Sequence, residues 1–225
     1  MATIGGTHTY GHNGVHRFGA TAIVACLTGL VAVRGQHVRG DGLVPEFMIV
    51  DLNGDGIRLS AVADGVRFTF AAGRAPAQTA WIARGAGDAF VVIDQNRDGR
   101  ITSAGELLGG ILGPPNGFEY LARVAAGRGA APSRLDTTHP LFRQLLLWTD
   151  ANHDGQSSED ELQSLQYAGF RAFDLARVRT LEQAADAGGN VVTRRGTVVR
   201  GCDGRGEVAV VTVRLAGAAV AQDGP

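Results

Sequence analysis

The sequence of 225 residues contains no lysine, because all 21 of its Lys and Arg positions are arginine. A P-loop, a Schiff-base lysine and a Ser–Lys dyad each need an amine, so this absence excludes all three. The 21 arginines face 22 Asp and Glu residues, which gives a formal net charge of −1. A chain so balanced has no overall field to hold it on nucleic acid or on an anionic membrane, and we expect neither partner.

Cysteine is also scarce. Cys26 and Cys202 are the only two cysteines, so they form one internal disulfide or stay as free thiols, and a four-cysteine zinc site is excluded. Glycine is abundant, with 33 residues, but it has no three-residue period, which excludes collagen. Hydrophobic residues make up 44% and charged residues 19%, the composition of a globular protein that buries a core.

An apolar run occupies residues 18–33. It is shorter than the roughly 20 residues of a membrane span, so no span is expected. Its length suits a secretory signal, although the preceding segment and the cleavage site fit poorly, and a buried strand pair is the alternative. We expect a leader or strand segment over 1–42, one domain over 43–217 and a tail over 218–225.

The order of apolar and turn residues predicts an α+β fold: short strands and helices around three loops, with a C-terminal β-hairpin. Alternating or continuous apolar runs predict strands at 47–51, 66–70 and 90–94, and a hairpin from 191–200 and 207–215. Helical spacing and capping residues predict helices at 103–110, 116–124 and 138–148, and another that begins at 158–161. Residues 125–135 are predicted to form a loop.

One pattern carries the chemistry: D-x-N-x-D-G occurs three times, beginning at Asp51, Asp94 and Asp150. This is the start of an EF-hand calcium loop, in which side chains at positions 1, 3 and 5 and the carbonyl at position 7 face one centre. Glycine at position 6 permits the turn, and a Glu near position 12 closes the shell. Ca²⁺ suits such flexible oxygen cages better than Mg²⁺, the second candidate ion. The alternative is an Asx-type turn without metal.

The three loops differ in completeness. The loop at Asp150 has Glu161 at position 12, the loop at Asp94 has Glu106 at position 13, and the loop at Asp51 has no such Glu, so Asp64 or Asp88 must supply its last ligand. The predicted metal ligands are Asp51, Asn53, Asp55, Ile57 and Asp88; Asp94, Asn96, Asp98, Arg100 and Glu106; and Asp150, Asn152, Asp154, Gln156 and Glu161.

The order of these motifs resembles the EF-hand-like, calcium-dependent self-processing module of bacterial RTX-type and other large secreted proteins. The matching segments run from Pro45 to Ile57, over Ala80-Trp81-Ile82, from Ile93 to Gly109, from Asn116 to Leu121 and from Trp148 to Leu162. In that family a Glu at position 13 belongs to the second loop. The resemblance implies calcium binding, secretion, and cleavage of an Asp-Pro bond just before the module.

Two departures from the family argue against cleavage. Val44 precedes Pro45, so the carboxylate that would attack the bond is missing, and no lysine is present to capture an anhydride. We therefore expect a non-catalytic calcium-binding module whose folding depends on extracellular calcium, with a calcium-dependent autoprotease or transpeptidase as the alternative. No hydrolase motif of another class is visible, and a protein partner stays unidentified.

Overall fold

A computed structural model describes residues 46–71, 73–109, 116–127, 133–182, 185–201, 204–213 and 215. The predicted leader, Val44 with Pro45, both cysteines and the C-terminal tail lie outside these residues. Within the described part of the chain, no helix is long and apolar enough to cross a membrane.

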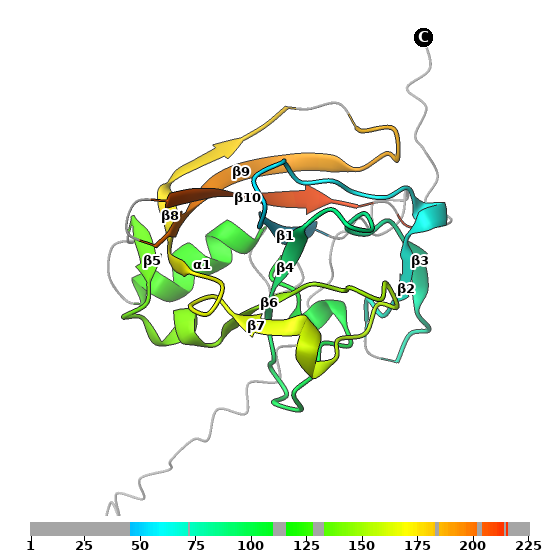
Figure 1. The fold of residues 1–225 in the computed structure, drawn as a ribbon, viewed down its shortest axis with the longest axis horizontal. Helices are drawn as coiled ribbons and strands as arrows, with labels where there is room; N and C mark the ends of the chain where they lie inside the picture. Colours follow the sequence, from blue (N-terminus) through cyan, green and yellow to red (C-terminus); the bar gives the residue numbers. More distant parts are fainter. Residues whose placement is uncertain are drawn as a thin grey trace, which may run out of the picture. The chain divides into compact units, whose positions relative to one another are not determined.

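Eight strands form one antiparallel sheet that curls around the α-helix α1 (Gly117–Ala126), as Figure 1 shows. Their order across the sheet is β5-β8-β9-β10-β1-β4-β6-β7. The strands at its two edges are therefore β5 and β7, which have three residues each. β2 and β3 form a separate pair. The strands of the sheet are β1 (Glu46–Asp51), β4 (Asp88–Ile93), β5 (Arg134–Asp136), β6 (Leu145–Trp148), β7 (Leu162–Ser164), β8 (Phe170–Thr180), β9 (Val191–Arg200) and β10 (Gly204–Thr212), and those of the pair are β2 (Val66–Phe68) and β3 (Ala77–Thr79).

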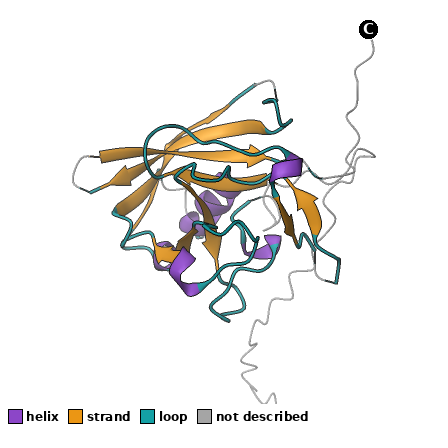
Figure 2. Ribbon diagram, turned by 45° about the vertical axis from the view of Figure 1, so that its right-hand side comes forward, coloured by secondary structure: helices purple, strands orange, loops and turns teal. Residues whose placement is uncertain are grey.

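The predicted α+β class is wrong, because the described residues are mostly β-structure (Figure 2). Among the described residues, only α1 (Gly117–Ala126) is an α-helix, and the side chain of Asn116 caps it by accepting from the backbone N–H of Glu119 at 3.1 Å. The other helical segments are short 3₁₀ turns: η1 (Val62–Asp64), η2 (Ala104–Glu106), η4 (Pro140–Arg143) and η5 (Glu159–Glu161).

Two predicted helices are absent because part of each segment pairs in the sheet instead. The segment at 138–148 begins with the turn η4, but its apolar end, Leu145–Trp148, is strand β6 and pairs with β4. Ser158 and Glu161 do form the predicted capping box, yet the chain makes only the turn η5 before β7 pairs with β6. A short apolar run fits a buried strand as well as a helix, and here sheet pairing decided between them. The predicted loop at 125–135 likewise ends in β5, which pairs with β8.

The predicted strands at 47–51 and 90–94, the hairpin and the helix at 116–124 are confirmed as β1, β4, β9–β10 and α1. β1 and β4 are apolar at successive positions because both faces of the sheet are covered. Met48 and Val91 point into a core that includes residues of α1, whereas Phe47 and Phe90 point into an aromatic core on the other face. The second core contains Trp81, whose ring centroid lies 4.4 Å from that of Phe90.

Close packing of α1 on the sheet makes a first prediction. A Cβ atom added at Gly196 in β9 would lie 2.6 Å from Cζ of Phe118 on α1. Gly196→Ala should therefore lower the free energy of unfolding by about 1–3 kcal/mol, measured by urea denaturation. In the double variant with Phe118→Leu the clash is relieved, so the two losses should not add. Simple additivity would contradict this account of the packing.

Candidate metal centre

The three acidic loops follow three neighbouring strands at the centre of the sheet. Asp51 ends β1, Asp94 follows β4 and Asp150 comes two residues after β6. Since β4 is antiparallel to both neighbours, the loops at Asp51 and Asp150 leave one end of the sheet and the loop at Asp94 leaves the other. We name them the first, second and third loops in chain order.

All three loops have the same internal hydrogen bond. In each, a carboxylate oxygen of the first Asp accepts from the backbone N–H of the glycine at position 6, at 2.9 Å. These glycines, Gly56, Gly99 and Gly155, have φ of 92°, 78° and 74°, a region that favours glycine. The Asn at position 3 accepts from the backbone N–H at position 5 in every copy. The turn is thus supported by its own side chains, so its conformation suits both a metal loop and a metal-free Asx-type turn.

The second loop gathers its carboxylates. One oxygen each from Asp94, Asp98 and Glu106 lies within 4.8 Å of the others. Glu106 reaches the group because the turn η2 places it there, and its Oε2 accepts from the backbone N–H of Thr102 at 3.0 Å. Its Oε1 is buried and has no hydrogen-bond partner among the described residues. Burial raises the pKa of Glu106, and the charges of Asp98 and Asp94 raise it further. A cation among these oxygens would relieve both costs.

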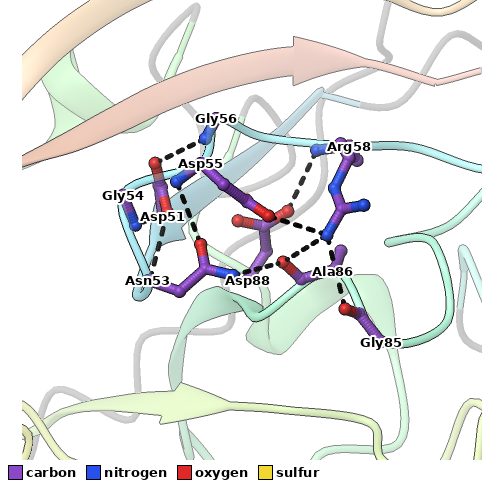
Figure 3. Close-up of polar contacts among 9 residues, drawn as sticks. All are labelled: Asp51, Asn53, Gly54, Asp55, Gly56, Arg58, Gly85, Ala86 and Asp88. Carbon is purple, nitrogen blue, oxygen red and sulfur yellow. Dashed lines mark hydrogen bonds and ion pairs between the residues drawn. The ribbon is translucent and has the colours of Figure 1, made fainter.

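The first loop takes its extra carboxylate from β4. Asp88 stands opposite Asp51 in the pairing of β1 with β4, and its side chain lies beside the loop in Figure 3. Its Oδ2 accepts from the backbone N–H of Arg58 at 3.0 Å, while its Oδ1 is buried without a partner in the described part of the chain. Burial, with the charges of Asp51 and Asp55, raises the pKa of Asp88 to about 6. Asp64, the other candidate ligand, is exposed on η1.

Arg58 brings a positive charge of the protein itself to the first loop. Its Nη2 donates to Asp55 Oδ2 at 2.9 Å and to the carbonyl oxygens of Ala86 at 3.1 Å and Gly85 at 3.4 Å (Figure 3). Asn53 also donates to the Ala86 carbonyl, at 3.1 Å. This role of Arg58 was not predicted from the sequence, although the residue stands at position 8, where the second loop has an apolar residue. A cation that binds here competes with this guanidinium for Asp55.

The third loop is the most complete in sequence, but it is held by hydrogen bonds to protein N–H groups. Glu161 Oε1 accepts from the backbone N–H groups of Ala151 and Asn152, and its Oε2 accepts from that of Ser158. Asp150 Oδ2 accepts from the indole Nε1 of Trp81 at 2.9 Å. Burial raises the pKa of Asp150, with Glu161 adding to the shift. Trp81 lies in one of the matching segments, but its contact with Asp150 was not predicted, because the two residues are 69 positions apart in sequence.

The remaining predicted ligands stay close to their loops. The backbone N–H groups of Arg100 and Gln156 donate to Asp98 and Asp154 within their own loops, at 2.8 and 2.7 Å. The amides of Asn96 and Asn152 donate to the same two aspartates. The side chain of Ile57 packs against the aromatic core. Their oxygens remain predicted ligands.

These features define a mostly β-domain with acidic turn loops at both ends of its central strands. Residues 48–214 match the SPM domain family, and the chain therefore belongs to that family. It is also 28% identical over 137 residues to the iron-regulated protein FrpA of Neisseria meningitidis serogroup C. That match covers 57% of this chain and 12% of FrpA, so the chain spans about an eighth of the length of this relative.

The buried carboxylate of Asp88 predicts a pH dependence of stability. In chelator, the folded state holds its proton up to about pH 6, whereas the ordinary pKa of Asp is 3.8. The folded state therefore binds more protons between these values, and stability falls as pH rises through that window. Asp88→Asn has no carboxylate to ionise, so it avoids this loss of stability. The substitution should raise the free energy of unfolding at pH 7 by about 1–3 kcal/mol, with little change near pH 4.

Urea denaturation in EDTA at both pH values measures this difference. Asp64→Asn is the matched control, because Asp64 is exposed, and it should change neither value. A stability gain of Asp88→Asn that is equal at both pH values would contradict the assignment to the ionised carboxylate.

Proposed function

We propose that this domain binds calcium through its EF-hand-like loops and acts as a non-catalytic module whose folding depends on extracellular calcium. One observation carries the proposal: Glu106, which has a buried oxygen without a hydrogen-bond partner among the described residues, forms a close group of carboxylates with Asp94 and Asp98. Buried carboxylates are normally paired, hydrogen-bonded or bound to a metal. The second loop is therefore the site that fits a divalent cation best.

The donor set favours calcium over other ions. Asp94, Asn96, Asp98, the Arg100 carbonyl and Glu106 would supply oxygen ligands only. Oxygen ligands suit hard cations, and an all-protein cage with a flexible loop suits Ca²⁺ better than Mg²⁺, which keeps several waters. Bound there, the ion would neutralise the crowded carboxylates, while the protein supplies the fixed turn and the buried Glu.

Binding at these loops stabilises the centre of the sheet, because each loop continues from β1, β4 or β6. For a site with a dissociation constant near 10 µM in about 1 mM calcium, occupancy adds roughly 2.7 kcal/mol. That is a large part of the stability of a typical domain. A module of this kind would be less stable in a low-calcium cytosol and would become fully stable after export, which is why we place its function outside the cell.

Removing the charge of Glu106 tests the proposal. We expect the wild-type protein to bind calcium in a calorimetric titration and to melt several degrees higher in calcium than in EDTA. Glu106→Gln should lose at least one bound ion and much of that thermal shift. Glu182→Gln, at an exposed position away from the three loops, is the control and should behave as wild type. Equal melting temperatures of the wild type in calcium and in EDTA would refute the proposal.

Calcium-dependent self-processing is the second candidate, favoured by the order of motifs shared with the self-processing module. Against it, Val44 stands where the cleavage chemistry needs the carboxylate of an Asp. A valine side chain has no nucleophilic oxygen to attack its own peptide carbonyl and release Pro45.

We therefore expect the protein to stay intact when it is incubated with millimolar calcium and followed by gel electrophoresis and N-terminal sequencing. Val44→Asp restores the missing group and is the matched variant that shows whether Val44 alone prevents cleavage. A new wild-type fragment that begins at Pro45 would overturn the assignment as a non-catalytic module.

A further inference from the structure

Arginine side chains from three neighbouring strands gather around one groove of the sheet. The strands β8, β9 and β10 lie side by side in Figure 1, and residues of all three line a groove of about 230 Å³. Four of the lining residues are arginines: Arg177 and Arg179 of β8, Arg195 of β9 and Arg205 of β10. The others are Gly196, Thr197, Gly206 and Glu207. We call this site the arginine groove, and none of its lining residues belongs to the three acidic loops.

The irregular register of β8 brings its charged side chains to the groove. In a regular strand, residues an odd number of positions apart point to opposite faces. Asp174 and Arg177 are separated in this way, yet Asp174 Oδ2 lies 3.7 Å from Nε of Arg177 and 3.7 Å from Nη1 of Arg205 on β10. The pairing of β8 with β9 shifts register between Asp174 and Arg179, and such irregularities re-aim side chains. The shift therefore lets Asp174 and Arg177 reach the same groove.

Arg179 stands opposite another arginine instead of a carboxylate. It pairs with Arg195 in the register of β8 and β9, and like charges at such cross-strand positions are unfavourable. Glu207 forms an ion pair with Arg195, and Asp174 is shared between the other two arginines of the groove. No carboxylate in the described part of the chain forms an ion pair with Arg179. The groove therefore keeps an excess of two positive charges, because its four arginines face two carboxylates.

We propose that the arginine groove binds a phosphomonoester, the phosphate of a water-soluble sugar phosphate. Such a group carries a charge of about −1.5 to −2 at neutral pH, which matches the excess charge of the groove. A guanidinium donates two parallel N–H bonds to two oxygens of one phosphate, so Arg179 gains the anionic partner that the described protein does not supply. The volume of about 230 Å³ is several times the ~30 Å³ of a water molecule, so the phosphate enters with part of its sugar.

The balance of charge favours a small soluble ligand over a polyanionic surface. The net charge of −1 gives the chain no long-range attraction to an anionic bilayer or to nucleic acid. A local excess of charge acts within about a Debye length, roughly 8 Å at physiological salt, so it selects a single anionic group that enters the groove. The hydroxyl of Thr197 adds a hydrogen-bonding group for the sugar or the phosphate. This site uses no metal, so the inference does not rest on calcium binding by the loops.

Substitutions of opposite charge at the groove test the proposal. Glucose 6-phosphate is the probe, titrated into the full chain in calcium buffer at low ionic strength and followed by calorimetry. Arg179→Gln should weaken binding at least about fivefold, because it removes a charge-assisted hydrogen bond. Glu207→Gln should tighten binding severalfold, because it frees Arg195 for the phosphate. Arg74→Gln makes the same change in net charge as Arg179→Gln at an exposed position outside the groove, and it should bind as the wild type does.

Three further results would overturn the inference. Wild-type affinity in Arg179→Gln, or weaker binding in Glu207→Gln, would show that the groove is not the site. Equal binding of glucuronate, whose carboxylate carries a single charge, would contradict the assignment to a phosphate. Binding to vesicles of phosphatidic acid and phosphatidylcholine without binding of glucose 6-phosphate would contradict a soluble ligand. A wild-type protein that binds no glucose 6-phosphate but still binds calcium would refute this inference and leave the proposed function intact.

Discussion

The pairing of β4 between β1 and β6 is the constraint on which the rest of the structure depends. All six residues of β4 are buried, and its two faces contribute to both hydrophobic cores. The same strand serves two loops, because its first residue, Asp88, joins the first loop and the residue after its end, Asp94, opens the second. Trp148 in β6 and Trp81 pack on Phe90 of this strand, so the third loop is also anchored to it through the Trp81–Asp150 hydrogen bond.

One sequence pattern is satisfied here in three ways. In the first loop an arginine of the protein neutralises an aspartate, and in the third loop backbone N–H groups and an indole hold the carboxylates. In the second loop the carboxylates are left facing one another. A raised pKa marks one carboxylate at each loop, and in all three the largest cause is burial. The three sites therefore differ less in their turn than in what the surrounding protein brings to it.

The sequence predicted what depends on local spacing. The strands at 47–51 and 90–94 and the capped helix at 116–124 follow from the pattern of apolar residues along the chain. The turns follow from the glycine at position 6 of each loop, which adopts a positive φ. Both features depend on residues that are close in sequence. The helix at 138–148 was wrong because its four apolar residues pair with a strand more than fifty positions earlier. The roles of Arg58 and Trp81 were missed for a related reason. These roles arise from contacts between segments that the fold, rather than the motif, brings together.

The edges of the sheet have a consequence for self-association. Both edge strands, β5 and β7, have only three residues, so each offers few free backbone N–H and C=O groups. A strand from another molecule needs a longer open edge to gain enough hydrogen bonds for stable β-addition. The long strands β8, β9 and β10 lie inside the sheet, but β5 pairs with β8 only at Ala172–Asp174 and β1 pairs with β10 only at Val208–Thr212. Where β5 and β7 form the edge, the described part of the sheet therefore offers few free backbone groups to a strand from another molecule.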